Sequence, residues 1–273
     1  MLSFNSKKQL KEFLSEDIGK GDITSALLPK RKISARIISR EEAVIAGVRH
    51  ASEIFKLKGS SVKIVKKDGS RVKPNQTIMT IFGNAGNVLM CERTALNLLT
   101  RMSGIATQTD QLVKKISDKK TKLYATRKTA PGLRYFDKEA VEIGGGKKHR
   151  LKLDEMVMIK DNHIAVSGSL LFLIKDAKRR YKKFEVEVEN TLDAVLAAKE
   201  GAAIIMLDNF SPEQIKKTIQ VLKDQKLRDS VLLEASGGIN SKNIAKYGNT
   251  GVDIISVGSI TNSVKGIDMS LEI

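Results

Sequence analysis

The feature that most constrains the fold is an alternation of short apolar strands with polar loops and helical patterns in the second half of the chain. Several of the candidate strands are continuous apolar runs, which is typical of parallel strands buried on both faces. The alternation predicts a parallel sheet, and the short spacing, with polar or glycine residues after each strand, favours an α/β barrel. The six candidates are Lys122–Ala125, Met156–Ile159, Phe184–Val188, Ala203–Leu207, Val231–Glu234 and Asp253–Val257.

Helix signals lie between these strands. Ser211 begins an S-x-x-Q capping box, and Pro212 follows at the first helical position. Asn190 or Thr191 is expected to cap the preceding helix, which Gly201 would end.

The first part of the chain has a different pattern. Residues 7–14 have apolar side chains at helical spacing, and residues 33–83 contain short β-branched stretches broken by turn residues. We expect a helix and then an antiparallel sheet, with KDGS (67–70) as a hairpin turn. A helical pattern over 88–117 follows, with an interruption expected near Ser103 and Gly104. The chain is therefore predicted to contain a small α+β unit followed by a barrel.

Three observations concern the cellular compartment in which the protein is expected to work. The longest apolar run, Ala202 to Leu207, has six residues, far below the roughly 20 of a membrane helix. Lysines interrupt the N-terminal apolar residues and no cleavage site follows, so no secretory signal is expected. Cys91 is the single cysteine and cannot form an internal disulfide, which favours a reducing, cytoplasmic location.

The charge balance is strongly basic: Lys+Arg 48 against Asp+Glu 31 gives +17. Such a chain either binds a polymer such as nucleic acid or handles small, highly anionic substrates. Nucleic-acid binders usually add stacking aromatic side chains. The 4 Tyr and 8 Phe are scattered and Trp is absent, which favours small anions.

Cationic side chains gather near the expected strand ends, where the active sites of α/β barrels lie. So many cations in one barrel mouth would repel each other unless an anion joined them, and arginine pairs with carboxylates and phosphates through two parallel hydrogen bonds. The sequence therefore predicts a polyanionic ligand; the alternative is a solvated, lysine-rich loop. The cluster comprises Arg127, Lys128, His149, Arg150 and Lys160.

The remaining strand ends suggest phosphate and metal sites. Ser236-Gly237-Gly238 and Gly258 follow the last two strands, where barrels commonly bind phosphate. Glu187 and Asp208 offer carboxylates that could hold Mg²⁺ on a pyrophosphate. Glu187 could equally be a barrel-interior carboxylate paired with a lysine.

Nine runs along nearly the whole chain resemble the quinolinate phosphoribosyltransferases, also called carboxylating nicotinate-nucleotide pyrophosphorylases. They are EDIGKGDIT (16–24), ERTALNLLTRMSGIAT (92–107), TRKTAPGLR (126–134), GGGKKHRL (144–151), MVMIKDNHI (156–164), EVEVEN (185–190), IIMLDNFSPE (204–213), LEASGGIN (233–240) and TGVDIISVGSIT (250–261).

The resemblance implies an N-terminal α/β sandwich domain and an open, incomplete TIM-like α/β barrel. Residues 1–104 would form the sandwich and 105–263 the barrel, with the tail 264–273 a candidate to return to the first domain. The implied reaction joins quinolinate to 5-phosphoribosyl 1-pyrophosphate and releases pyrophosphate and CO₂. The product, nicotinate mononucleotide, feeds NAD biosynthesis. A homodimer is implied, with a hexamer (a trimer of dimers) left open, and neither a membrane nor a nucleic acid is expected as a partner.

The resemblance also implies roles for particular residues. Arg93 would reach quinolinate in the site of the partner subunit, and Lys128 would lie near the phosphoribosyl pyrophosphate. Glu187 and Asp208 would bind the ribose and the Mg²⁺–pyrophosphate, and with Lys128 they are the expected catalytic residues. The quinolinate pocket would comprise Arg127, His149, Arg150 and Lys160, and the phosphate cradle Ser236, Gly237, Gly238 and Gly258.

Two positions depart from the family pattern. Lys148 stands where many members have asparagine, and Asn262 where many have histidine. The alternatives that remain are a molybdate-transport-associated paralogue of the same fold, a nicotinate phosphoribosyltransferase that does not decarboxylate, and a basic nucleic-acid-binding or scaffold protein.

Overall fold

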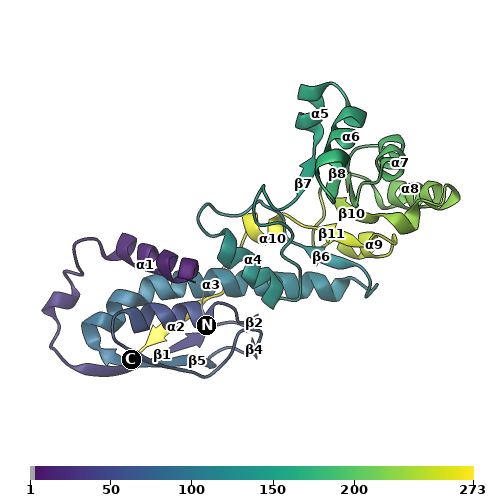
Figure 1. Ribbon diagram of the computed structural model, residues 1–273. Helices are drawn as coiled ribbons and strands as arrows, with labels where there is room; N and C mark the ends of the chain where they lie inside the picture. Colours follow the sequence, from purple (N-terminus) through teal and green to yellow (C-terminus); the bar gives the residue numbers. More distant parts are fainter. Residues whose placement is uncertain (1–3) are drawn as a thin grey trace. The chain divides into compact units, whose positions relative to one another are not determined.

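The computed structural model describes residues 4–273 and divides into two compact units (Figure 1). The first unit combines residues 1–110, 130–145 and 263–273, and the second combines 111–129 and 146–262. The two units are therefore interleaved along the sequence. The predicted boundary near residue 104 places 130–145 in the barrel, whereas the structure assigns this segment to the first unit.

The first unit is built on an antiparallel sheet of order β12-β1-β5-β3. Ile37 and Met79, which pair across β1 and β5, are fully buried, as is Phe55 of α2. The sheet strands are β1 (Lys32–Ser39), β3 (Ser61–Ile64), β5 (Thr77–Asn84) and β12 (Met269–Glu272). A two-stranded sheet joins β2 (Ala43–Val44) to β4 (Arg71–Val72). The helices are α1 (Phe4–Ile18), η1 (Ser25–Leu27), α2 (Val48–Leu57), the first part of α3 (Ala85–Lys115), and α4 (Arg134–Ile143).

The region expected to be all sheet contains a helix. Helix α2 interrupts it and buries Ile54 and Phe55, so the expectation of strands throughout 33–83 was wrong at this point. The KDGS turn forms, but it does not close a hairpin. Strand β3 before it pairs with β5, while β4 after it pairs with β2.

Helix α3 has no break at Ser103 and Gly104, contrary to expectation. The Ser103 hydroxyl bonds the backbone N–H and C=O of Ala46 instead of unwinding the helix. A Cβ on Gly104 would lie 2.1 Å from the backbone oxygen of Lys265. Glycine at this position therefore permits close approach of the C-terminal segment, and does not mark a turn.

The second unit contains a six-stranded parallel sheet of order β6-β11-β10-β9-β8-β7. Strands β6 and β7 form its two edges, so the barrel is open, and the predicted fold class is confirmed. All six predicted strands are present within two residues of their expected bounds. They are β6 (Lys122–Tyr124), β7 (Val157–Ile159), β8 (Phe184–Val188), β9 (Ile204–Asp208), β10 (Leu232–Ser236) and β11 (Ile254–Ser256).

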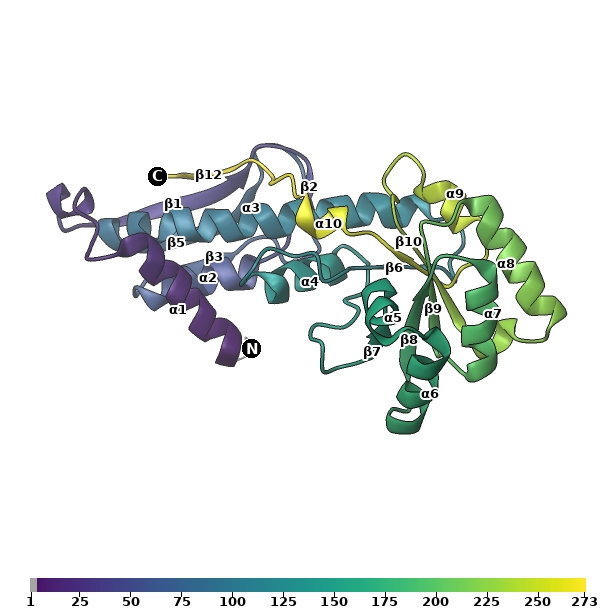
Figure 2. The same cartoon turned by 90° about the horizontal axis from the view of Figure 1, so that it is seen from above.

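Helices connect these strands, and α6, α7 and α8 flank β8 to β10 (Figure 2). The predicted caps are confirmed. Ser211 and Gln214 form the capping box of α8, Asn190 caps α7, and Gly201 ends α7 in a left-handed conformation. The helical segments are α5 (Asp161–Ser167), α6 (Leu170–Arg180), α7 (Thr191–Glu200), α8 (Pro212–Asp224), η2 (Arg228–Ser230), α9 (Ile244–Gly248) and α10 (Ser259–Asn262). None of the helices in residues 4–273 is long and apolar enough to cross a membrane.

Candidate active site

The strand ends of the second unit surround a cavity of about 400 Å³. Parallel register brings side chains from neighbouring strands to the same face: Glu187 lies opposite Met206, and Ser236 opposite Asp208. Because side chains alternate along a strand, residues two apart, such as Met206 and Asp208 of β9, line the cavity together. The lining residues are Ala125, Thr126, Arg127, Lys128, His149, Arg150, Met158, Lys160, Glu187, Met206, Asp208, Glu234, Ser236 and Ser256.

The structure brings together most of the predicted site residues. The whole cationic cluster and both candidate metal carboxylates line this one cavity. Arg93 is different: it belongs to α3 in the first unit and lines another, open cavity there with Arg40 and Lys265. The predicted cavity residues are Arg127, Lys128, His149, Arg150, Lys160, Glu187, Asp208 and Ser236.

Two cavity arginines carry donors that suit an anion. The Nε atom of Arg127 is buried and has no hydrogen-bond partner among residues 4–273. Arg150 is held by two contacts: its Nη1 donates to the Met156 backbone oxygen at 2.7 Å, and its Nη2 donates to Met158 Sδ at 3.2 Å. The pKa of Arg150 is lowered overall. Burial lowers it most, the negative charge of Glu185 raises it, and the neighbouring positive charge of Arg127 lowers it further. The two guanidinium groups therefore repel each other, and a bound anion relieves that repulsion.

Loop contacts hold Lys128 and the glycines of the predicted phosphate cradle. The Lys128 N–H donates to Thr126 Oγ1 at 3.1 Å, and the Thr261 hydroxyl donates to the Lys128 backbone oxygen at 2.8 Å. A Cβ on Gly258 would lie 3.0 Å from the Lys128 side chain. The lack of a side chain at Gly258 therefore leaves room for the side chain of Lys128.

Gly237 and Gly238 form a tight turn directly after Ser236. Their φ angles are 92° and 62°, a left-handed conformation that favours glycine. A Cβ on Gly237 would lie 2.2 Å from Asn209 Oδ1. The turns after β9 and β10 thus pack against each other at the level of Asp208.

Each of the two candidate metal carboxylates contacts a polar side chain beside it. Glu187 forms an ion pair with Lys160, and Asp208 Oδ2 accepts a hydrogen bond from Asn209 Nδ2 at 2.7 Å. Both side chains line the cavity on adjacent strands. Carboxylate oxygens facing space for phosphate and water are the donors that Mg²⁺ prefers, so this pair fits a magnesium site. The pairing of Glu187 with a lysine was the alternative interpretation of that residue, and the structure contains both features.

A buried cluster lies beneath the cationic groups. His149 Nε2 is 3.3 Å from Glu185 Oε2 and 3.5 Å from Glu234 Oε2, and both carboxylates are fully buried. Burial alone would lower the pKa of His149, but hydrogen bonding to the two facing carboxylates and their negative charge outweigh it and raise that pKa. Burial also raises the pKa of Glu185. His149 and Glu185 therefore share a proton at neutral pH.

Hydrogen bonding indicates where the protons of the cluster lie. The Arg150 backbone N–H donates to His149 Nδ1 at 2.7 Å, so Nδ1 presents a lone pair and the ring is neutral, with its proton on Nε2. The shared proton then lies on Glu185, whose pKa is raised by burial. The ligand atoms of the cluster lie within 4.8 Å of one another, close enough for a metal ion, but the shared proton already offsets the paired carboxylates. Sequence reasoning missed Glu234 and gave Glu185 no role. The E-V-E-V-E alternation does predict that Glu185 faces the same side of the strand as Glu187.

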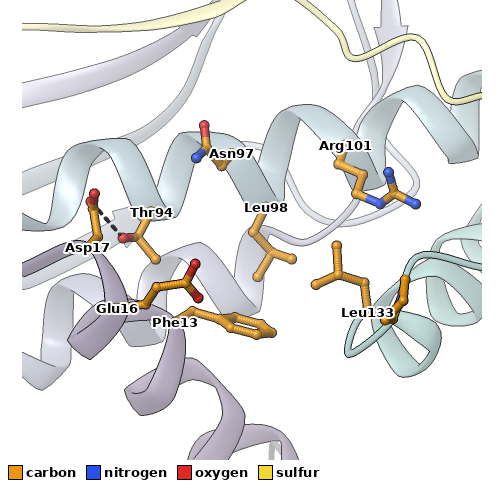
Figure 3. A pocket seen from close by; sticks show the side chains of 9 residues that line it. Phe13, Glu16, Asp17, Thr94, Asn97, Leu98, Arg101 and Leu133 are labelled. Carbon is orange, nitrogen blue, oxygen red and sulfur yellow. Dashed lines mark hydrogen bonds between the residues drawn. The ribbon is translucent and has the colours of Figure 1, made fainter.

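A second cavity, of about 440 Å³, lies in the first unit between α1, α3 and the segment before α4 (Figure 3). Three of its polar lining residues already have partners: Thr94 donates to Asp17 at 3.1 Å, and Arg101 makes two 2.8 Å bonds to Asp137. The lining also carries Glu16 and apolar side chains such as Phe13 and Leu98. The barrel cavity is therefore the better site for a polyanion.

An open α/β barrel whose strand ends gather arginines, lysines and paired carboxylates defines an enzyme for phosphate-bearing substrates. Comparison with known proteins identifies the family. Residues 22–103 match the model of the quinolinate phosphoribosyl transferase N-terminal domain, and residues 105–272 match that of the C-terminal domain. The chain belongs to the quinolinate phosphoribosyltransferase family.

Full-length relatives agree with this assignment. The probable nicotinate-nucleotide pyrophosphorylase [carboxylating] of Methanothermobacter thermautotrophicus is 46% identical over 275 residues, covering 97% of each chain. The nicotinate-nucleotide pyrophosphorylase [carboxylating] of Mycobacterium leprae is 38% identical, covering 98% of this chain and 97% of its own. The solved nicotinate-nucleotide pyrophosphorylase of Francisella tularensis superimposes with a TM-score of 0.92 at 39% identity, covering 100% of this chain and 97% of its own.

Proposed function

We propose that the protein transfers the phosphoribosyl group of 5-phosphoribosyl 1-pyrophosphate to quinolinate, with decarboxylation, to give nicotinate mononucleotide in NAD biosynthesis. The observation that carries the proposal is the single cavity that gathers Arg127, Lys128, Arg150 and Lys160 beside Glu187 and Asp208. A pyridine dicarboxylate and a sugar with three phosphate groups together supply the anions that these cations need.

Each step of the reaction uses groups that line the cavity. The pyridine nitrogen attacks ribose C1, the bond from C1 to the pyrophosphate oxygen breaks, and pyrophosphate leaves with the electron pair. Arg127, Arg150 and Lys160 hold the two carboxylates, and such positioning can supply several kcal/mol. Lys128 faces the negative charge that develops on the leaving group. The carboxylate beside the ring nitrogen then departs as CO₂, and the ring carbon keeps the electron pair and takes up a proton.

Glu187 and Asp208 serve the ribose side of the reaction. Their negative charge favours the cationic character that develops at C1, and their oxygens accept hydrogen bonds from ribose hydroxyls. The same two side chains would hold Mg²⁺. When bound, that ion supplies positive charge to the pyrophosphate.

The proposal includes a homodimer in the cytoplasm, with assembly of three dimers into a hexamer as an alternative. Arg93 supports the dimer, because it lines a cavity of the first unit and not the barrel cavity. In the proposed assembly Arg93 reaches quinolinate in the site of the partner subunit. Mixing Arg93→Ala and Lys128→Ala subunits tests this: hybrid dimers contain one intact site, so about a quarter of wild-type activity returns on random mixing. Absence of any recovery, with mixed dimers demonstrated, would exclude a shared site.

The decisive experiment is a product assay. Purified protein, Mg²⁺ and 5-phosphoribosyl 1-pyrophosphate are incubated with quinolinate or with nicotinate, and mononucleotide and CO₂ are followed. We expect mononucleotide and equimolar CO₂ from quinolinate only. Product from nicotinate instead would overturn the dicarboxylate pocket but keep the phosphate site. No product from either would favour the molybdate-associated paralogue.

A further inference from the structure

The imidazole of His149 is engaged on three sides within the barrel. Its Nε2 atom is fully buried and faces the carboxylates of Glu185 and Glu234. Its Nδ1 atom accepts the backbone N–H of Arg150. The ring also packs edge-on against Tyr124, with centroids 5.7 Å apart and planes at 83°. Both ring nitrogens are therefore used inside the protein.

The backbone at His149 has an uncommon conformation. Its φ angle is 53°, in the left-handed region that is uncommon outside glycine, although asparagine, aspartate and histidine adopt it more often than other residues. Such a conformation persists only where the surroundings over-determine it. The contacts of the ring supply that restraint, because they fix the side chain to the barrel floor and the ring in turn holds the next backbone N–H.

The residue that follows is Arg150, whose guanidinium lines the cavity. The left-handed turn at His149 sets the direction in which the chain leaves, and therefore the direction of the Arg150 side chain. The Glu234 carboxylate is itself held, since the Ser256 hydroxyl donates to its Oε1 at 2.5 Å. A continuous series of contacts thus runs from Ser256 through Glu234 and His149 to Arg150.

We propose that Glu185 and Glu234 are positioning residues, which hold the His149 ring and through it fix the backbone turn that aims Arg150 at the carboxylates of the substrate. The identity of the substrate rests on the proposed function. The anchor, by which we mean the contacts of Glu185 and Glu234 with the His149 ring, rests only on the geometry. Because the anchor acts through Arg150, we expect it to affect binding of the dicarboxylate and not binding of the phosphoribosyl donor.

Kinetics of Glu234→Gln and Glu234→Ala test the proposal. We expect the KM for quinolinate to rise about 10- to 100-fold, the cost of misplacing a binding group by about 1 Å, and the KM for 5-phosphoribosyl 1-pyrophosphate to stay within about twofold. Glu189→Gln is the matched control, since it makes the same chemical change at an exposed glutamate that directly follows β8, the strand of Glu185. Equal increases in both KM values would indicate a general structural role and overturn the proposal, as would no increase in either.

A second measurement does not depend on turnover or on the stability of a variant. The chain has three histidines, so ¹⁵N NMR of histidine-labelled wild-type protein, with His163→Gln to aid assignment, resolves each ring. We expect His149 Nδ1 to be unprotonated and Nε2 protonated at neutral pH. A protonated Nδ1 would break the link to Arg150 and refute the anchor.

Failure of the anchor can be separated from failure of the proposed function. Phthalate has two adjacent carboxylates but no ring nitrogen, so it can bind and cannot react. If wild-type protein converts no quinolinate, the proposed function fails, while weaker phthalate binding by Glu234→Gln in calorimetry, with the expected tautomer, still supports the anchor. If wild type converts quinolinate and the variants bind phthalate unchanged, the anchor alone fails.

Discussion

Replacing Arg127 by alanine isolates the contribution of one guanidinium to substrate binding. Its side chain lines the cavity, and its buried Nε has no hydrogen-bond partner among residues 4–273, so we expect the guanidinium to bind the substrate. A hydrogen bond to a charged group contributes about 1.5–3 kcal/mol. At 1.36 kcal/mol per factor of ten, loss of that contact lowers kcat/KM for quinolinate by about 10- to 150-fold. The repulsion between Arg127 and Arg150 also disappears, so the variant should melt no lower than wild type.

The assay follows mononucleotide formation while quinolinate is varied at saturating 5-phosphoribosyl 1-pyrophosphate, with Tm recorded for each protein. Arg127→Lys keeps the charge and loses the fork geometry, so it should recover part of the activity. Arg179→Ala is the charge-matched control, because Arg179 lies on the surface and forms an ion pair with the neighbouring Asp176. If kcat/KM of Arg127→Ala stays within twofold of wild type, Arg127 does not contact the substrate and the reasoning is refuted.

Three further predictions concern the turn, a helix cap and the cysteine. Gly237→Ala places a Cβ against Asn209 and strains a φ of 92°; we expect at least a tenfold higher KM for 5-phosphoribosyl 1-pyrophosphate, and an unchanged KM would remove this turn from the phosphate site. Ser211→Ala removes the capping box of α8 and should cost about 1 kcal/mol, seen as a Tm about 2–4 °C lower, with kinetics unchanged. Burial raises the pKa of Cys91 to about 11, so the thiol is protonated at pH 8 and should react with a disulfide reagent only after unfolding; rapid labelling of native protein would contradict this.

Features that depend on local sequence signals, or on the position of a residue at a strand end, were predicted correctly from the sequence. Several of the six barrel strands are continuous apolar runs, and Ser211 and Gln214 cap α8 through contacts three residues apart. The cationic cluster was also predictable, because all barrel strand ends point the same way and their loops converge. These inferences need only the order of elements along the chain.

Inferences that depend on distant partners failed. Gly104 resembles a helix break, but its function depends on Lys265, far along the chain. The turn at KDGS was recognised, yet a turn does not determine which strands its neighbours join. Glu234 was missed because only the parallel register places it near His149, and nothing local to LEASGG distinguishes an anchor from an ordinary buried residue.

The return of β12 to the first sheet has a consequence for synthesis on the ribosome. Residues 36–39 of β1 pair with β12, which is translated only after the whole second unit. Throughout that interval one edge of the first sheet carries unpaired backbone groups, which can recruit another chain. Nascent protein is therefore most exposed to aggregation just before its final strand emerges, and a ribosome stalled near residue 262 would release a barrel attached to an incomplete sheet.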